Sequence, residues 1–266
     1  MANCTIDRNK IEKIDIINVK GGLTATQVYK QYKPDYFINL ALYDMASGEN
    51  ITFLEDNNKS SGYLFSNKGI GIKNDKELIW TTVDNAYASN EIKDFVSGSP
   101  ILVQDGVKTI DWGNKYSSYV DGKHKRTFFG FNDDSLILCC SDSNLTISSE
   151  ADTAIKLGCK FAINCDGGGS CHLQIGSTVL QKSTRANVSW LLIYLKKEQT
   201  QESNTTKFKN NSSISLPVYE TTSCKKKIGS LDPYEECTLL YEDTTFRVVM
   251  YNITGKTERK VGFVRK

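Results

Sequence analysis

The residues best suited to chemistry lie in the stretch FAINCDGGGSCHLQ, residues 161–174. A short apolar run typical of a strand leads into Asn164, Asp166 and three consecutive glycines, Gly167–Gly169, which Ser170 follows. Side chains at i and i+2 of a strand share a face, so Asn164 and Asp166 would project into the same space. Adjacent glycines let backbone N–H groups approach a ligand and can form an anion-binding concavity. The stretch predicts a carboxylate beside an anion site, with a simple glycine-rich turn containing Asp166 as the alternative.

Three familiar glycine-rich sites do not fit the flanks of this stretch. A P-loop needs Gly-Lys-Ser/Thr at the start of a helix, whereas Ser170 is followed by Cys171, His172 and another strand-like run. The dinucleotide pattern G-x-G-x-x-G is absent. The hydrolase pattern Gly-x-Ser-x-Gly fails at its last position. The sequence therefore gives no indication of a nucleotide-phosphate loop or a serine nucleophile.

Charge and hydropathy exclude two classes of partner. The 33 basic and 31 acidic residues are mixed along the chain, so no basic stripe of the kind that binds nucleic acid stands out. No run approaches the roughly 18 apolar residues of a membrane span, and the charged first 22 residues do not resemble a signal peptide. We expect no nucleic-acid partner and no membrane span. The expected location is cytoplasmic, or virion-associated and released without a classical signal.

Neither the cysteines nor the histidines form a recognisable catalytic or metal pattern. The eight cysteines include no Cys-x-x-Cys pair, and most lie in apolar runs, which predicts free thiols that pack as small hydrophobic groups. His124 and His172 are the only histidines, too few for a histidine-rich zinc site. We assign a catalytic role to neither, although His172 lies next to the glycine run.

The elements that must position these groups are mostly strands. Short β-like runs bounded by Gly, Asn, Asp or Ser dominate residues 35–196. Two helices are predicted, Thr24 to Tyr32 and about Ser148 to Leu157, with Gly158 placed to end the second. The second helix leads directly into the strand before Asp166. The predicted fold class is α+β, a strand-rich domain with few helices.

A change in composition divides the chain. The polar stretch after Lys197 has no periodic apolar face, which is typical of a linker. The predicted organisation is a domain at 1–198, a linker at 199–211 and a small all-β domain at 212–266. The last segment alternates strands with turn residues and is large enough to form a small barrel, although one of marginal stability.

Four segments, read in order, resemble the phosphodiester glycosidase family, which is typified by the enzyme that uncovers mannose 6-phosphate on lysosomal proteins. They are FINLALYDMASGENITFLEDNN, SGSPILVQDG, RTFFGFNDDSLILCCSDS, and the segment from LTISSEAD through NCDGGGS to the strand VSWLLIYL. The last carries the family signature Asn-x-Asp-Gly-Gly-Gly-Ser and a downstream arginine, and is the most specific. The resemblance covers roughly residues 30–196.

The resemblance implies a set of site residues and two departures from the family pattern. Leu40 and Ala41 replace the usual glycines after Asn39, which could narrow the pocket, and Cys171 replaces a common second serine. The implied site residues are Asn39, Arg126, Glu150, Asn164, Asp166, Gly167, Gly168, Gly169, Ser170 and Arg185.

The implied reaction is hydrolysis of the sugar C1–O bond of a glycosyl-1-phosphodiester. The substrate would be a sugar-phosphate like an N-acetylglucosamine-1-phosphodiester, or a related glycopolymer or nucleotide. A phosphate leaves as a stabilised anion, so Arg126 and Arg185 could replace much of a general acid. Asp166 and Glu150 are the candidate carboxylates that activate water or attack the anomeric carbon, with Asp166 preferred. Glu150 could instead only favour a helix N-terminus, and Arg126 could be a solvated strand residue.

The remaining site residues would have binding roles in this hypothesis. Asn39, Asn164 and Ser170, with the glycines, would bind sugar hydroxyls or phosphate. No cofactor is required by the sequence, but a carboxylate cluster could hold calcium or magnesium together with phosphate, a point that the sequence leaves open.

The last 55 or so residues contain the segments LPVYET, KKIGSLDPYEECTLL and KVGFVRK, through which they resemble a bacterial SH3-like domain. The resemblance implies a module that binds bacterial cell wall and a bacterial or phage origin. Fold alone does not fix that function, and the alternative is a stability or oligomerisation cap. For the main domain the alternative is a non-catalytic carbohydrate- or nucleotide-binding protein, sequestering or structural in a virion, that uses the same pocket.

Overall fold

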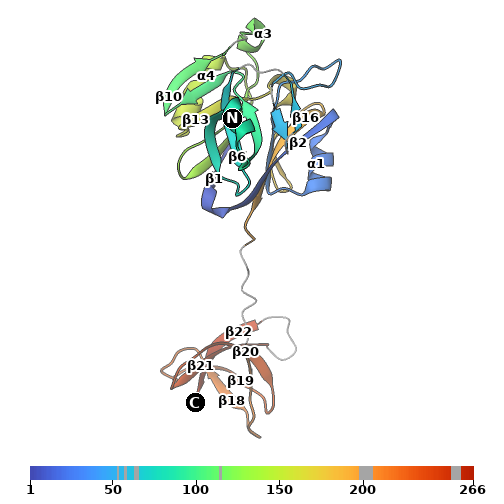
Figure 1. Cartoon of the computed structure of the whole chain (residues 1–266). Helices are drawn as coiled ribbons and strands as arrows, with labels where there is room; N and C mark the ends of the chain where they lie inside the picture. Colours follow the sequence, from blue (N-terminus) through green and yellow to red (C-terminus); the bar gives the residue numbers. More distant parts are fainter. Residues whose placement is uncertain (53, 57–58, 63–65, 114–115, 198–205, 253–258) are drawn as a thin grey trace. The chain divides into compact units, whose positions relative to one another are not determined.

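The chain forms two compact units, residues 1–196 and residues 197–266. The structure is a computed structural model that describes residues 1–52, 54–56, 59–62, 66–113, 116–197, 206–252 and 259–266 (Figure 1). Four α-helices are present among the described residues, against a much larger number of strands. None of the described helices has the length and apolar character needed to cross a membrane. The first unit is therefore the strand-rich α+β fold that the sequence predicts.

The sheet that carries the glycine stretch has six antiparallel strands. Its strand β13 (Phe161–Asn164) pairs with β11, and Phe128 faces Asn164 across the ladder. The four inner strands of the sheet are buried on both faces, which explains why their sequences are continuous apolar runs, whereas the two edge strands are partly exposed. In order, the strands are β1 (Ala2–Asp7), β12 (Ser135–Cys140), β11 (Thr127–Phe131), β13, β9 (Ile101–Gln104) and β10 (Val107–Asp111).

A second, five-stranded sheet packs against the first through the largest hydrophobic core cluster. Alternate residues of its strand β16 divide between two cores. Leu191 and Ile193 enter the core shared with the first sheet, whereas Trp190 and Leu192 face helix α1 (Ala25–Tyr32). The strands are β15 (Thr178–Gln181), β14 (Leu173–Ile175), β3 (Tyr36–Asn39), β16 (Asn187–Leu195) and β2 (Ile11–Leu23).

A third sheet of five strands completes the first unit. Ile70, Ile72 and Val96 from this sheet join the main core. Its strands are β5 (Lys59–Ser61), β4 (Leu54–Asp56), β8 (Ile92–Ser97), β6 (Lys68–Lys73) and β7 (Leu78–Thr82), and the short helix α2 (Val83–Ala88) follows β7.

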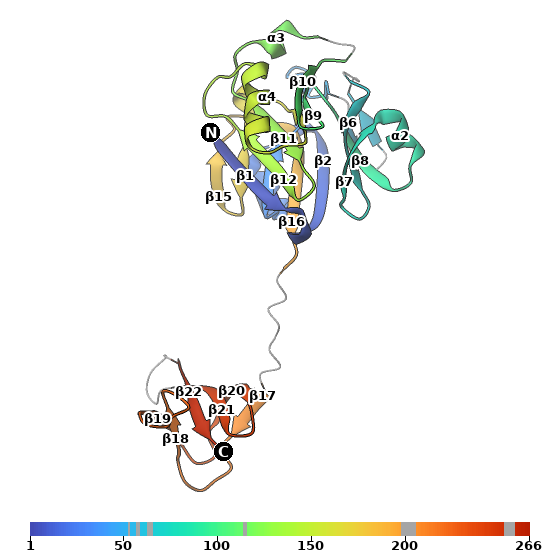
Figure 2. The ribbon, with the colours of Figure 1, turned by 90° about the vertical axis from the view of Figure 1, so that its left-hand side faces the viewer.

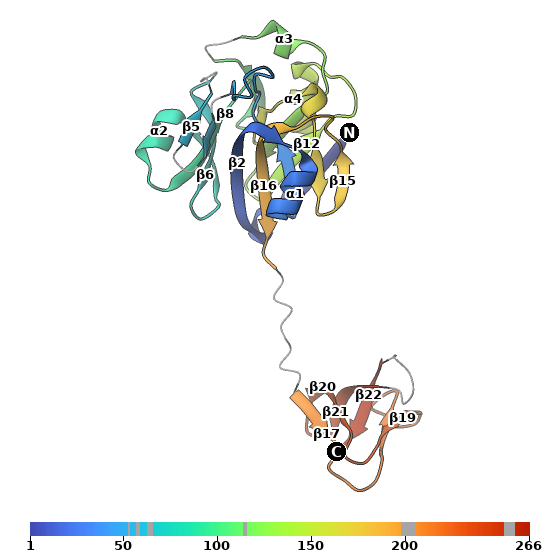
Figure 3. The same cartoon turned by 90° about the vertical axis from the view of Figure 1, so that its right-hand side faces the viewer.

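The two longer helices cover the outer faces of the two main sheets. Helix α4 (Ile147–Lys156) packs Ile147, Ala151 and Ala154 onto the first sheet (Figure 2). Helix α1 lies beside β16 and begins with a capping box in which Thr24 and Gln27 satisfy each other's backbone N–H groups (Figure 3). Both helices were predicted, and both are confirmed to within one residue.

Gly158 follows the α4 C-cap with a φ of +87°, the left-handed conformation that ends helices. The sequence did not predict β1, β2, α2 or α3 (Ser118–Asp121). In β1 and β2 polar residues alternate with apolar ones, which is the pattern of a half-buried strand, so this signal was present in the sequence and was missed; α2 and α3 are too short to show a helical period.

The second unit is a six-stranded antiparallel sheet with its own core of Val218, Leu231, Val249 and neighbouring residues. Among the described residues this sheet ends at β17 and β19 and does not close, so the SH3-like barrel stays a prediction. The strands are β17 (Thr206–Lys209), β20 (Glu236–Glu242), β21 (Phe246–Asn252), β22 (Arg259–Arg265), β18 (Leu216–Tyr219) and β19 (Lys227–Leu231).

The predicted linker, 199–211, needs a correction at its end. Residues 199–205 lie outside the described residues, but 206–209 form β17, which pairs with β20 in the six-stranded sheet of the second unit. Its Phe208 packs against the core of that unit, which is why this polar segment is ordered as a strand.

All eight cysteines are free thiols, six of them buried, as the sequence predicts.

Candidate active site

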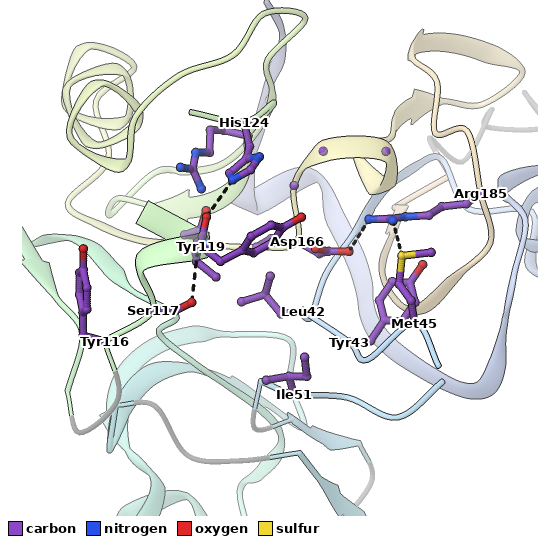
Figure 4. Close-up of a pocket in the computed structure, with 17 residues that line it drawn as sticks. Leu42, Tyr43, Met45, Ile51, Tyr116, Ser117, Tyr119, His124, Asp166 and Arg185 are labelled. Atoms are coloured by element: carbon purple, nitrogen blue, oxygen red, sulfur yellow. Dashed lines mark hydrogen bonds and ion pairs between the residues drawn. The ribbon is translucent and has the colours of Figure 1, made fainter. Parts of the chain in front are cut away.

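A cavity of about 400 Å³ opens at the carboxyl end of β13 (Figure 4). Arg126, Asn164, Asp166, Gly167–Gly169 and Arg185 all line it. These residues come from three segments that are far apart in the sequence: the start of β11, the end of β13 with the loop after it, and the loop before β16. The structure therefore brings together most of the predicted site.

Asp166 is the one candidate carboxylate on the cavity wall. Its side chain follows β13, and its backbone N–H donates to the carbonyl of Leu40 at 2.8 Å. Burial raises the pKa of Asp166 to about 6, while a hydrogen bond from Ser170 and the charge of Arg185 act in the opposite direction. A carboxyl with a pKa near neutrality is suited to take a proton from water.

Arg185 faces Asp166 across a short gap. Its Nη2 lies 3.8 Å from Asp166 Oδ2, its Nε donates to Ser170 Oγ at 2.8 Å, and its Nη1 contacts the Met45 sulfur at 2.7 Å (Figure 4). The guanidinium also lies over the Tyr43 ring, 5.6 Å from its centroid. A thioether is a weak acceptor, so an anionic ligand would be a much better partner for Nη1.

Arg126 reaches the same cavity but is more tightly engaged. Its Nε donates to the Leu145 carbonyl at 3.0 Å, and its Nη2 donates to the Gly122 carbonyl. Burial lowers the pKa of the guanidinium, and Glu150, 4.0 Å away, acts in the opposite direction. The predicted planar fork is thus partly used by backbone carbonyls, and Arg126 contributes mainly positive charge.

Glu150 lies behind Arg126 and does not line the cavity. Its side chain is 1% exposed, and neither carboxylate oxygen has a hydrogen-bond partner among the described residues. Burial raises the pKa of Glu150 well above its usual range. Of the two carboxylates that the sequence proposes as catalytic, only Asp166 is placed to meet a ligand.

Asn39 does not line the cavity but supports the loop that carries Asp166. It is fully buried at the end of β3, where its Nδ2 donates to the Asp166 carbonyl at 2.7 Å. Its Oδ1 accepts from the His172 N–H at 2.8 Å and from Thr127 Oγ1 at 3.3 Å. The sequence predicts that Asn39 contacts substrate; the structure instead uses its whole amide to hold the Asp166 loop.

Ser170 and Asn164 are both buried, but only Asn164 lines the cavity. Ser170 is fully buried, and its Oγ is the acceptor that fixes Arg185. Asn164 lines the cavity and donates from Nδ2 to the Ser99 carbonyl at 2.6 Å, while its Oδ1 has no hydrogen-bond partner among the described residues. Ser170 is therefore a support for Arg185, and Asn164 remains a candidate contact for ligand.

The three glycines allow close packing more than they present free amides. A Cβ at Gly167 would lie 2.4 Å from the Lys125 carbonyl oxygen, and one at Gly169 would lie 2.8 Å from Thr184 Oγ1. Gly168 has a φ of +59°, and its N–H already donates to the Lys125 carbonyl. The glycines line the cavity, but the Gly168 amide is used within the protein.

The two substituted positions after Asn39 do not narrow the cavity. Leu40 is buried in the main core, and Ala41 is also buried. Neither lines the cavity. The wall beyond them is formed by Leu42 and Tyr43, which the sequence did not single out.

His172 is a buried structural residue. Its Nδ1 accepts from the Ser183 N–H at 3.2 Å, which places the proton on Nε2, 3.1 Å from the side-chain oxygen Oε1 of Gln174. Burial lowers its pKa to about 4, so the ring is neutral at physiological pH. His124 does line the cavity, where its Nε2 donates to the Tyr119 carbonyl at 2.8 Å.

The rest of the wall is apolar or aromatic and was not predicted. It comes from two segments, one after β3 and one around α3. No pattern of period 2 or 3.6 marks these residues, because both segments are loops with at most one turn of helix. The members are Leu42, Tyr43, Met45, Ile51, Tyr116, Tyr119 and Val120.

A metal is not tested by this geometry. Within the described ranges, no group of three or more His, Cys, Asp and Glu side chains is placed to hold an ion. The calcium or magnesium that the sequence leaves open stays a prediction.

Comparison with known proteins gives a family and a fold. A family model described as phosphodiester glycosidase matches residues 17–194. Among solved structures, the chain is similar to the catalytic domain of zebrafish N-acetylglucosamine-1-phosphodiester alpha-N-acetylglucosaminidase auto-inhibited by its pro-peptide. The TM-score is 0.58 at 18% identity, over 69% of this chain and 73% of that one.

A second similar structure is a hypothetical protein from Synechocystis, with a TM-score of 0.54 at 12% identity, over 73% of this chain and 59% of that one. At these identities the two structures show the shared fold alone. A search of the curated proteins found no match.

Proposed function

Because this chain belongs to the phosphodiester glycosidase family, we propose that it hydrolyses the C1–O bond of a glycosyl-1-phosphodiester. The products are a free sugar and a phosphomonoester. The single observation that carries the proposal is that Asp166 shares one cavity with two arginines, Arg126 and Arg185. A base beside two cations is what cleavage with an anionic leaving group needs.

Asp166 is the proposed base or nucleophile. With a pKa of about 6 it is mainly ionised at neutral pH. It can take a proton from the attacking water, or attack the anomeric carbon itself in a two-step route. Water supplies the oxygen that ends on the sugar C1, and the bond from C1 to the phosphate oxygen breaks.

The phosphate is proposed to lie between the two guanidinium groups. Charge that develops on the leaving oxygen is stabilised there without a protonated acid. Arg185 is the more available of the two, since its Nη1 has only the Met45 sulfur as partner among the described residues. Asn164 Oδ1 is the proposed acceptor for a sugar hydroxyl or amide N–H.

A panel of α-glycosyl-1-phosphodiesters with different sugars, assayed for released sugar, tests the proposal. Wild-type protein is compared with Asp166→Asn and Arg185→Ala. The expected loss for Asp166→Asn is roughly 10²- to 10⁴-fold in kcat, the usual contribution of a positioned base. Turnover unchanged in both variants would overturn the site. Tight binding with no release would favour the alternative, a protein that holds its ligand without cutting it.

For the second unit we propose binding to bacterial cell wall, on the basis of its all-β fold and the sequence resemblance to SH3-like domains. The test is sedimentation of the full chain with purified cell walls at low and at high salt. Retention supports the proposal, and a chain that stays in the supernatant under both conditions shows that the unit does not target cell wall.

A further inference from the structure

The cavity has two chemically different ends. The polar end contains Asp166, Arg126, Arg185 and the glycine loop. The rest of the lining includes an apolar wall, defined here as Leu42, Tyr43, Ile51, Tyr116, Tyr119 and Val120, which meets the polar end at Tyr43, where the Arg185 guanidinium lies over the ring. In Figure 4, Tyr116 lies on the side of the cavity away from Arg185, and the Tyr119 ring extends from that side toward Asp166. A substrate that fills the cavity must match both ends.

Two of the three tyrosine hydroxyls of this wall are already used within the protein, and that of Tyr119 has no partner among the described residues. The Tyr43 hydroxyl donates to the Ala186 carbonyl at 2.8 Å, and the Tyr116 hydroxyl donates to Asp121 Oδ2 at 2.9 Å. The Ser117 hydroxyl between the wall residues accepts from the Val120 N–H at 3.3 Å. A sugar ring, with several hydroxyls to satisfy, would find few partners there.

The wall is also built before any ligand arrives. The Leu42 carbonyl accepts from the N–H of Ile51 at 2.6 Å and from that of Thr52 at 3.2 Å, which ties the two ends of its segment together. Trp112 supports Tyr116 with its ring at 5.0 Å in an edge-on contact. A preorganised apolar surface binds an apolar group without a further ordering cost.

Large apolar surface remains open on this wall. Tyr119 is 79% exposed and Tyr116 is 61% exposed, although both line a cavity. Exposed aromatic groups gathered around a cavity are typical of a ligand site. The polar end supplies the hydrogen-bonding and charged groups that sugar and phosphate need, so the third part of the substrate is left for the wall.

Resting on the function proposed above, we propose that the phosphate of the substrate is esterified to an apolar alcohol, alkyl or aryl, which packs on the apolar wall. The sugar and phosphate then occupy the polar end. This selects against diesters whose alcohol is a polyol, because a polyol would lose water at hydroxyls that the wall cannot satisfy.

Binding of phosphomonoesters, the proposed products, tests the wall without any need for turnover. Titration calorimetry is run with inorganic phosphate, methyl, propyl and hexyl phosphate, phenyl phosphate and glycerol phosphate. We expect Kd to fall about fourfold for each methylene that packs on the wall. Phenyl and hexyl phosphate distinguish an aryl from an alkyl alcohol, and tight binding of either one supports the proposal.

Two variants locate the effect. Leu42→Ser and Tyr119→Ser should flatten the dependence of Kd on chain length while leaving inorganic phosphate binding within twofold. Tyr241→Ser, at a tyrosine of the second unit that is 59% exposed, is the matched control and should keep the full dependence. Thermal unfolding of each variant shows whether a flattened dependence of Kd on chain length results from the changed wall or from loss of the folded structure.

The proposal is overturned if neither hexyl nor phenyl phosphate binds more tightly than methyl phosphate, if the gain in affinity survives in both wall variants, or if glycerol phosphate binds as tightly as propyl phosphate. These results are independent of the reaction. A chain-length dependence in a protein that releases no sugar would refute the proposed hydrolysis and leave the wall in place.

Discussion

Arg185 lies 3.8 Å from Asp166, Nη2 to Oδ2, in a pair that is close enough for charge interaction and too long for a hydrogen bond. Ser170 holds the arginine in place from a buried position. The pair therefore leaves the carboxylate available for chemistry and the guanidinium available for an anion. Several expectations depend on this geometry.

The pH dependence should follow Asp166. The carboxylate must be ionised to act as a base, and its pKa is about 6. We expect kcat/KM to fall about tenfold per pH unit below that value and to level off above it. Bound phosphate would offset the charge of Arg185, so the corresponding pKa in the kcat profile should lie higher than in kcat/KM.

A pH–rate profile of wild-type protein over pH 4 to 8 checks this expectation, with circular dichroism at each pH to show that the fold persists. A profile that is flat from pH 4 to 8 would contradict ionised Asp166 as the reacting form.

Arg185→Lys should keep the positive charge and lose the planar set of guanidinium N–H donors. Lysine cannot donate to Ser170 and at the same time present a planar pair of donors to phosphate. We expect kcat/KM to fall about 10- to 100-fold, the usual effect of losing hydrogen bonds to a charged group. Steady-state kinetics measures it. Arg247→Lys, at an exposed ion pair with Glu242 in the second unit, is the control.

Asn39→Ala should lower both stability and kcat. The three hydrogen bonds of the Asn39 side chain would be lost, leaving buried groups without partners at a cost of about 1–3 kcal/mol in the free energy of unfolding. Since Asn39 holds the Asp166 backbone, kcat should fall more than KM rises. Chemical denaturation and steady-state kinetics measure the two effects.

Asn210→Ala is the matched control for Asn39. Asn210 is also fully buried, and its Nδ2 donates to three backbone carbonyls in the second unit. It should destabilise its own unit and leave kcat unchanged. Equal kcat in Asn39→Ala and wild type would show that the asparagine does not position Asp166.

Much of the fold could be predicted from the sequence. Within the site, the residues that could be predicted are those next to a regular strand or helix. The run before Asp166 is apolar because β13 is buried on both faces, and α4 shows its apolar face at helical spacing. The apolar wall could not be predicted, since Leu42, Ile51 and Tyr119 lie in segments with no period. The sequence pattern also could not show that Asn39 and Glu150 lie behind the cavity lining rather than on it. In a sequence, a polar residue that faces a cavity looks the same as one that is buried behind it.

Glu150→Gln should be tolerated better than Asp166→Asn. Both carboxylate oxygens of Glu150 lack hydrogen-bond partners among the described residues, and burial raises its pKa, so a neutral amide of the same shape removes little. We expect kcat to fall less than tenfold, through an altered charge at Arg126. Kinetics of both variants under the same conditions decides, and an equal loss in the two would place Glu150 in contact with substrate.

The central claim is that the sugar C1–O bond is the one that breaks. Hydrolysis of a glycosyl-1-phosphodiester in water enriched in heavy oxygen, with mass spectrometry of both products, tests it most directly. The account predicts that the label is found in the released sugar and not in the phosphomonoester. Label in the phosphomonoester would mean that water attacks phosphorus, and would contradict the assignment of Asp166 and the two arginines to cleavage at the sugar.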